Sequence, residues 1–249
     1  WEMGKNYPAE IAVRGEVKET LNALNPLVDK KGGIEHSMIA TSRLKAISHI
    51  NWSAKRKQKT EIALAKRDSV PIHSDWLMME ICSCLPEDII VVNEGLTTSW
   101  NLLNFLSFND RYNFHSYASG GIGWALPAAI GVQLAQPSRP VIALIGDGSA
   151  MYSIQALWTA ANLKLPITFV IANNQGYRII KQRLLAFHGN DQFIGMDFTD
   201  PPINFVGLAE SLGVSAQKIN EADAVRPAIQ AALSYNGPSL LDVSVERSV

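Results

Sequence analysis

Two aliphatic runs, residues 141–145 and 167–172, constrain the fold of this chain more than any other feature. Each has the length of one strand, and apart from Thr168 each is apolar throughout, so both of its faces must be buried. The segment between them has helical spacing, with Ile154, Leu157, Trp158 and Ala161 as expected core positions of a helix over 149–163. Buried strands that alternate with helices indicate a parallel sheet covered on both sides. We therefore predict a doubly wound α/β domain.

The same alternation extends from residue 70 to the end of the chain, and we assign residues 70–249 to one domain. Besides the two runs, the pattern predicts helices over 74–84, 125–135, 205–212 and 222–232, and strands at 89–92 and 240–245.

The residues before this domain carry a weaker pattern. Residues 17–24 have helical spacing, and Pro26 is expected to lie just past the end of that helix. We interpret residues 1–29 as the tail of a preceding domain and residues 30–69 as a basic, partly helical linker. Because the first residue is Trp1, we expect the sequence to be part of a longer chain.

Composition limits the classes of function. The chain has 22 Lys and Arg against 23 Asp and Glu, so no positive surplus favours nucleic acid or an anionic membrane surface. No apolar stretch approaches the length of a membrane span. Cys82 and Cys84 lack the second pair that a zinc site needs, and we expect free thiols in a reducing compartment, the cytoplasm.

Two polar residues follow the aliphatic runs, Asp147 after the first and Asn174 after the second. Because a βαβ crossover is right-handed, the two strands are expected to be neighbours, and their carboxyl ends meet where open α/β sheets bind ligands. A carboxylate and an amide oxygen suit magnesium or calcium, and magnesium usually completes its shell with water and phosphates. Gly146 and Gly148 allow backbone N–H groups to approach an anion, and Ser149 adds a hydroxyl at a helix N-terminus. The residues predict a metal-bridged diphosphate.

Either half of this pattern alone is a common turn, and the prediction depends on finding both in one βαβ unit. The motif Gly146-Asp147-Gly148-Ser149 followed by Asn173-Asn174 resembles the signature of thiamine-diphosphate enzymes, with Asn174 twenty-seven positions after Asp147. Residues 118–133 and 156–161 are similar to benzoylformate decarboxylase and related 2-oxo-acid decarboxylases. The resemblance covers roughly residues 70–249.

The resemblance implies thiamine diphosphate and Mg²⁺ as cofactors and decarboxylation of a 2-oxo acid, or carboligation, as the activity. It implies that the metal is bound by Asp147, Asn174 and the carbonyl of Gly176. It further implies that Thr97, Thr98, Gly148, Ser149 and Tyr152 contact the diphosphate, that the carbonyl of Gly120 accepts from the 4′-amino group, and that Ile122 supports the bent cofactor beneath the thiazolium ring.

In the family, the glutamate that activates the aminopyrimidine belongs to a separate N-terminal domain. The resemblance therefore implies that this chain forms an inactive half-site, completed by the pyrimidine-binding domain of a partner subunit in a homodimer or homotetramer. No catalytic residue is assigned.

Several alternatives stay open. An acetolactate-synthase-like carboligase, with or without FAD, and a non-catalytic cofactor-binding module are the other readings of the same motif. A dinucleotide site is rejected, because Gly121-Ile122-Gly123 does not form a G-x-G-x-x-G motif after a buried strand. Pyruvate decarboxylases carry a glutamate where this chain has Ile180, so their mechanism is not expected. Leu96 stands where benzoylformate decarboxylase has a hydroxyl residue.

The charged residues near the motif have two readings each. Arg178, Lys181 and Arg183 either attract an acidic or CoA-bearing substrate or form a solvated helix face, which we favour. Glu94, after a strand, is either a site acid or a helix-capping carboxylate. His115 is assigned no role.

Overall fold

The computed structural model describes residues 6–249, and contacts divide the chain into two units, Trp1–Lys55 and Arg56–Val249. The first unit holds α1 (Val17–Lys31), α2 (Ile34–Ile47) and the start of α3 (Trp52–Leu64), and neither α1 nor α2 buries a residue. The expected stop at Pro26 is wrong, because α1 continues through this proline to Lys31 and ends at Gly32. Among the described helices, none combines the length and hydropathy that a membrane span requires.

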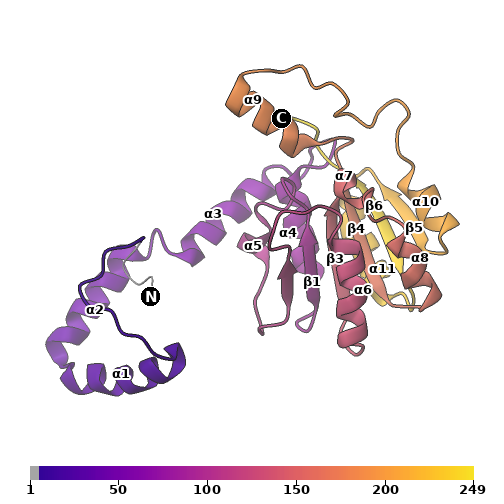
Figure 1. Ribbon diagram of the computed structural model, residues 1–249. Coiled ribbons are helices and arrows are strands. Elements are labelled where there is room, and N and C mark those ends of the chain that lie inside the picture. The colour runs from indigo at the N-terminus through magenta and orange to yellow at the C-terminus, as the bar shows by residue number, and fades with distance from the viewer. Residues whose placement is uncertain (1–5) are drawn as a thin grey trace. The chain divides into compact units, whose positions relative to one another are not determined.

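The second unit contains a six-stranded sheet, in which every neighbouring pair of strands is parallel. The strand order is β2-β1-β3-β4-β6-β5, and Figure 1 shows the sheet with helices on both sides. The predicted doubly wound α/β fold is confirmed, as is the pairing of the two aliphatic runs, in which Val141 faces Ile167. The strands are β1 (Ile90–Glu94), β2 (Phe114–Ser116), β3 (Val141–Gly146), β4 (Ile167–Asn173), β5 (Ser215–Ile219) and β6 (Ser239–Ser244).

Alternate residues of the strands pack into two separate cores, which explains why the runs are apolar on both faces. Ile142 and Leu144 of β3 belong to the core on one face, whereas Ala143 and Ile145 belong to the core on the other. The first core includes residues of α4 (Ser74–Cys84), α5 (Leu102–Phe105) and α11 (Ala222–Ser234), and the second includes residues of α6 (Ala125–Ala135), α8 (Ala156–Asn162) and α10 (Phe205–Ser211).

The helix expected over 149–163 differs from the prediction. It is divided into α7 (Asp147–Ala150) and α8 (Ala156–Asn162), with turns between them. Within α8, Leu157 and Ala160 are buried, whereas Trp158 is 56% exposed. The assignment of Trp158 to the core is therefore wrong. The remaining helix, α9 (Arg178–His188), follows β4.

We predict that truncating a buried and an exposed aromatic residue changes the free energy of unfolding by very different amounts. Phe169→Ala removes a fully buried ring from β4 and should lower the free energy of unfolding by about 3–5 kcal/mol. Trp158→Ala removes an exposed ring and should change it by less than about 0.5 kcal/mol. Urea denaturation of both variants measures the difference, and equal losses would contradict the burial of Phe169 and the exposure of Trp158.

Candidate functional site

Asp147 connects the two loops that follow β3 and β4. The residue is 2% exposed. Its Oδ1 accepts the backbone N–H of Gly148 at 2.8 Å, and its Oδ2 accepts that of Gly176 at 3.0 Å. The side chain is thus held by both loops at the carboxyl edge of the sheet, where the sequence predicted it.

Asn174 and Ser149 present buried polar atoms that have no partner. Asn174 Oδ1 and Ser149 Oγ are inaccessible and accept or donate no hydrogen bond among the described residues. The neighbouring Asn173 differs, because its amide donates to Asp242 and its Oδ1 accepts from the Gln175 N–H. Unpaired buried polar atoms are rare in folded proteins and call for an explanation, such as a missing ligand. A carboxylate beside a free amide oxygen is a donor set that suits Mg²⁺.

These residues line one cavity of ≈ 110 Å³. That volume is well below the ~300–1,000 Å³ typical of complete small-molecule sites. Of the predicted site residues, the cavity brings together Thr97, Ile122, Gly146, Asp147, Gly148, Ser149, Asn174 and Gly176. Thr98, Gly120 and Tyr152 do not line it: Thr98 is buried beside it, whereas Gly120 and Tyr152 are exposed.

Two glycines of the cavity are required by close packing. A Cβ on Gly148 would lie 2.6 Å from Cε1 of Tyr177, and one on Gly176 would lie 2.5 Å from the carbonyl oxygen of Met196. Tyr177 itself stands edge-on to Phe198, with ring centroids 4.7 Å apart. The Gly176 carbonyl, the predicted third metal ligand, accepts the N–H of Arg178 at 3.0 Å and retains a second lone pair.

Two non-glycine residues at the strand ends adopt the left-handed backbone region. Leu96, after β1, has φ 47°, and Gln175, after β4, has φ 57°. Such conformations cost energy in residues with a Cβ and cluster at functional sites. Leu96 lines the cavity, and Gln175 directly follows Asn174.

Glu94 is a capping carboxylate, which decides between its two readings. It is fully buried, and its two oxygens accept the N–H groups of Gly123 and Ala125, both at 2.6 Å. Ala125 is the first residue of α6, so the negative charge lies at a helix N-terminus, where it is favoured. The bonds also fix the glycine-rich turn that carries Gly120 and Ile122.

Arg178 is a buried residue whose role the sequence did not indicate. Its guanidinium Nε donates to Thr97 Oγ1 at 2.9 Å, and its Nη2 donates to Thr98 Oγ1 at 3.3 Å. Further bonds reach Ser74 Oγ and the carbonyl of Glu246. Because the Thr97 hydroxyl accepts from Arg178, its own proton stays available for an anion in the cavity, which Thr97 lines.

The reading of the basic residues as a solvated helix face is wrong for two of the three. Arg178 and Lys181 are 7% and 8% exposed, and Lys181 pairs with Asp197. Only Arg183 faces solvent, beside the ring of Phe187. His115 lies half-buried on β2, near the edge of the sheet.

Burial raises the pKa of Asp147 from its usual 3.8 to about 6, although the N–H groups of Gly148, Gly176 and Gln175 oppose the shift. The pKa of Tyr177 is raised by burial and further by Tyr152 and the charge of Asp147. The cavity therefore has an anionic residue that is unfavourably placed unless a cation or proton accompanies it.

The fold and cavity define a doubly wound α/β protein with its site at the carboxyl ends of β3 and β4. Residues 95–243, more than half of the chain, match the C-terminal TPP binding domain of thiamine pyrophosphate enzymes. The chain belongs to this family, and the sequence resemblance is confirmed.

Relatives with different activities share this domain. The benzoylformate decarboxylase of Pseudomonas aeruginosa is 33% identical over 71% of this chain and 33% of its own length. The acetolactate synthase large subunit of Porphyra purpurea is 29% identical over 98% of this chain and 40% of its own length. The solved structure of the thiamine-diphosphate-dependent 4-hydroxybenzoylformate decarboxylase of Rhodococcus jostii is 36% identical, with a TM-score of 0.68 over 72% of this chain and 34% of that one. The chain thus spans 33–40% of these curated relatives.

We predict that Glu94→Gln destabilises the domain. The amide offers one acceptor oxygen where the carboxylate offers two, and its NH₂ would face a buried N–H, so we expect a loss of about 1–3 kcal/mol. Glu87→Gln, at an exposed position, is the matched control and should have no measurable effect. Chemical denaturation compares the two variants. An unchanged free energy of unfolding in Glu94→Gln would rule out the capping role.

The raised pKa of Asp147 predicts a pH-dependent cost in metal-free protein. The folded state holds the Asp147 proton more tightly than the unfolded state does. The stability that this proton contributes is therefore fully present below pH 3.8 and is lost as the pH rises through about 6. The wild type should lose about 3 kcal/mol relative to Asp147→Asn over that window. Denaturation curves with chelator from acid to neutral pH measure the difference. Parallel curves for the two proteins would contradict the prediction, and exposed Asp191→Asn is the control.

Proposed function

We propose that this chain forms the diphosphate- and Mg²⁺-binding half of the active site of a thiamine-diphosphate-dependent 2-oxo-acid decarboxylase similar to benzoylformate decarboxylase. The observation that carries the proposal is the buried carboxylate of Asp147 beside the unpartnered Oδ1 of Asn174 in one cavity. When bound, thiamine diphosphate supplies the electron sink for loss of carbon dioxide from a 2-oxo acid.

The roles of this chain's residues are to bind and orient. Asp147, Asn174 and the Gly176 carbonyl would hold the metal, and Ser149 Oγ would satisfy its hydrogen bond on the diphosphate. Gly146 and Gly148 would offer backbone to that anion; a Cβ on Gly148 would meet Tyr177, whereas a Cβ on Gly146 would meet nothing within 4 Å. Thr97 and Thr98, oriented by Arg178, would donate from the side of β1.

The remaining predicted contacts lie nearer the solvent. Ile122 lines the cavity from the glycine-rich turn that Glu94 fixes, which fits a support for the thiazolium ring. Gly120 has φ +75° and is exposed, and Tyr152 is 59% exposed. Their proposed contacts, the 4′-amino group for the Gly120 carbonyl and the diphosphate for Tyr152, require a cofactor that extends beyond the cavity.

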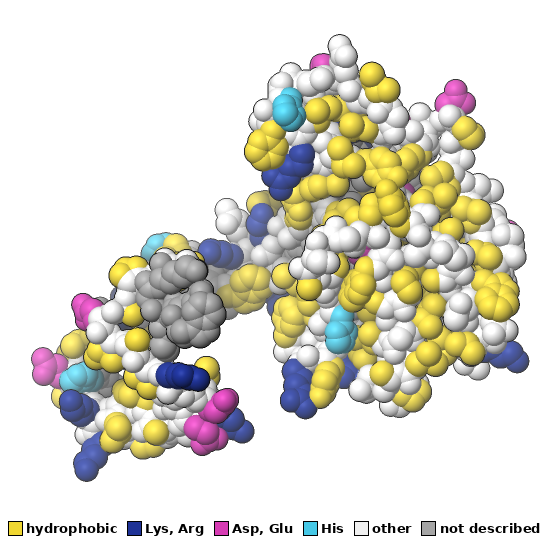
Figure 2. All heavy atoms as spheres, in the orientation of Figure 1, with side chains coloured by type: hydrophobic (Ala, Val, Ile, Leu, Met, Phe, Trp, Pro, Cys, Tyr) yellow, Lys and Arg dark blue, Asp and Glu magenta, His cyan; other side chains and the backbone are white. Residues whose placement is uncertain are grey.

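The cavity of ≈ 110 Å³ supports a half-site, because it is too small for the whole cofactor. Large apolar side chains nearby stay exposed, including Met151, Ile180 and Phe187. Figure 2 shows hydrophobic side chains gathered on the face over α9 and below it. We propose that the pyrimidine-binding domain of a partner subunit covers this face in a homodimer or homotetramer. Both thiols are free, which fits the cytoplasm as the location.

Acetolactate-synthase-like carboligation is the second candidate, favoured by a relative that aligns over 98% of this chain. Assembled with its partner domain, an enzyme of the first kind would release carbon dioxide and an aldehyde from benzoylformate. One of the second kind would join two molecules of pyruvate into acetolactate with release of one carbon dioxide. A third reading, a cofactor-binding module without activity, predicts binding and neither product.

Calorimetric titration of the chain with thiamine diphosphate, with and without Mg²⁺, tests the proposal. We expect weak binding that requires Mg²⁺ and is lost in Asn174→Ala and in Asp147→Ala. Because Asn174 Oδ1 has no partner within the described residues, Asn174→Ala should keep the Tm of the wild type in metal-free buffer.

Asn162→Ala, at an exposed position on α8, is the matched control and should bind as the wild type does. Binding that persists unchanged in Asn174→Ala and Asp147→Ala would overturn the assignment of the metal ligands. Binding that is independent of Mg²⁺ would overturn the metal itself.

A further inference from the structure

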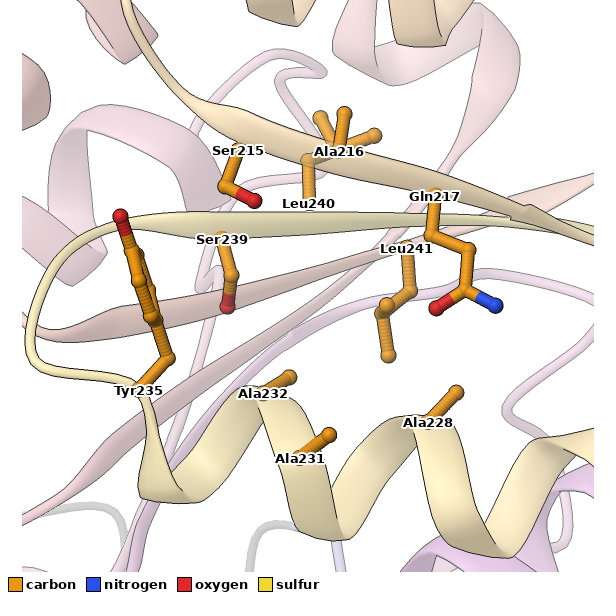
Figure 3. A pocket seen from close by; sticks show the side chains of 10 residues that line it. All are labelled: Ser215, Ala216, Gln217, Ala228, Ala231, Ala232, Tyr235, Ser239, Leu240 and Leu241. Atoms are coloured by element: carbon orange, nitrogen blue, oxygen red, sulfur yellow. The ribbon is translucent and has the colours of Figure 1, made fainter.

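The lining of the cofactor cavity carries two charged side chains among the described residues, Asp147 and Arg178. Arg178 is the first residue of α9, and it is 7% exposed. The larger cavity of ≈ 380 Å³ between α11 and the starts of β5 and β6, drawn in Figure 3, has no charged residue in the described part of its lining. A buried guanidinium at the cofactor cavity calls for a physical explanation, because a charge is costly to bury without a counter-charge.

Hydrogen bonds satisfy the guanidinium of Arg178 but do not neutralise it. Its four side-chain hydrogen bonds go to neutral oxygens, which are three hydroxyls and one carbonyl: Thr97, Thr98, Ser74 and Glu246. Within the described part of the chain, the carboxylate that pairs with it is that of Glu246, whose Oε1 lies 3.8 Å from Nη1. That oxygen already accepts from Ser74 Oγ at 2.8 Å, and Oε2 lies 3.4 Å from Nε2 of His73. The long, shared pair leaves part of the positive charge unbalanced.

The charge balance of a loaded site supplies the explanation. A diphosphate monoester carries roughly two to three negative charges near neutral pH. Mg²⁺ and the single charge of Asp147 together offset only about one of them, so an excess of about one to two negative charges would remain in the cavity. Burial lowers the pKa of the Arg178 guanidinium, and the charges of Glu246 and Asp147 oppose the shift. Arg178 and Asp147 therefore lie within electrostatic range of each other.

We propose that Arg178 provides the counter-charge for the cofactor's diphosphate, acting through its own charge and through the Thr97 hydroxyl that it orients. Thr97 Oγ1 accepts from Nε of Arg178 at 2.9 Å and lines the cavity, so the polarised hydroxyl would donate to the anion. Arg178 is thereby a positioning residue for the diphosphate. Its effect on the metal is the reverse, because a cation repels Mg²⁺. This role rests on the proposed function, in which Asp147 and Asn174 bind the metal.

Neutralising Arg178 should therefore change the affinities for cofactor and metal in opposite directions. In Arg178→Met, calorimetric titration with thiamine diphosphate at saturating Mg²⁺ should show binding weakened about tenfold to a hundredfold. Mn²⁺ alone, followed by the EPR signal of the free ion, should bind about twofold to tenfold more tightly, because the repelling cation is gone. Arg178→Lys keeps the charge and loses the planar fork, so it should restore the wild-type Mn²⁺ affinity and part of the thiamine diphosphate affinity.

Glu246→Gln tests the same charges with the opposite sign. The amide keeps an oxygen that can accept from Ser74, so the variant should fold, and it removes the negative charge 3.8 Å from the guanidinium. We expect thiamine diphosphate to bind about twofold to fivefold more tightly and Mn²⁺ to bind more weakly by a similar factor. Arg183→Met, at an exposed position of the same helix, is the matched control and should change neither affinity.

The results distinguish this role from the proposed function. If the wild type binds thiamine diphosphate with Mg²⁺ and Arg178→Met weakens both ligands together, or changes neither, Arg178 is a structural residue and only its role as counter-charge is lost. If circular dichroism shows that Arg178→Met does not fold, Glu246→Gln decides, and unchanged affinities in that variant count against the role. A wild type that does not bind thiamine diphosphate with Mg²⁺ would overturn the proposed function and this role with it.

Discussion

The buried carboxylate of Asp147 is the constraint on which the cofactor edge of the sheet depends. Both oxygens accept backbone N–H groups, one from its own loop and one from the loop after β4. This arrangement requires β3 and β4 to be adjacent and in register, which their shared aliphatic pairing provides. Asn174 lies two positions before Gly176 and lines the same cavity as Asp147, so the geometry of the sheet determines the geometry of the site.

Two further buried charges hold the surrounding loops. Glu94, at the end of β1, accepts from the glycine-rich turn before α6. Arg178, at the start of α9, donates to the threonines after β1 and to the carbonyl of Glu246 near the end of the chain. Such charges are costly to bury unless fully hydrogen-bonded. Their bonds therefore fix loops that would otherwise move, which is the preorganisation that a cofactor site needs.

The sequence predicted the sheet, most of its helices and the pair Asp147 and Asn174, because buried parallel strands leave an unbroken apolar run and the ligand edge follows from their topology. It missed β2 and β5, which are edge strands with mixed composition and partly exposed residues. Arg178 could not be recognised, since its partners lie 68 to 104 positions away in the sequence. For Glu94 a signal existed: like Asp147, it is an acidic residue at the end of a buried strand.

Unpaired buried polar atoms distinguish residues that bind a ligand from residues that stabilise the fold of this domain. Asn173 and Asn174 are identical in type and adjacent, yet the first satisfies its amide on Asp242 and Gln175, and the second leaves Oδ1 unpaired. A residue of the first kind stabilises the fold, whereas one of the second kind weakens it until a ligand arrives.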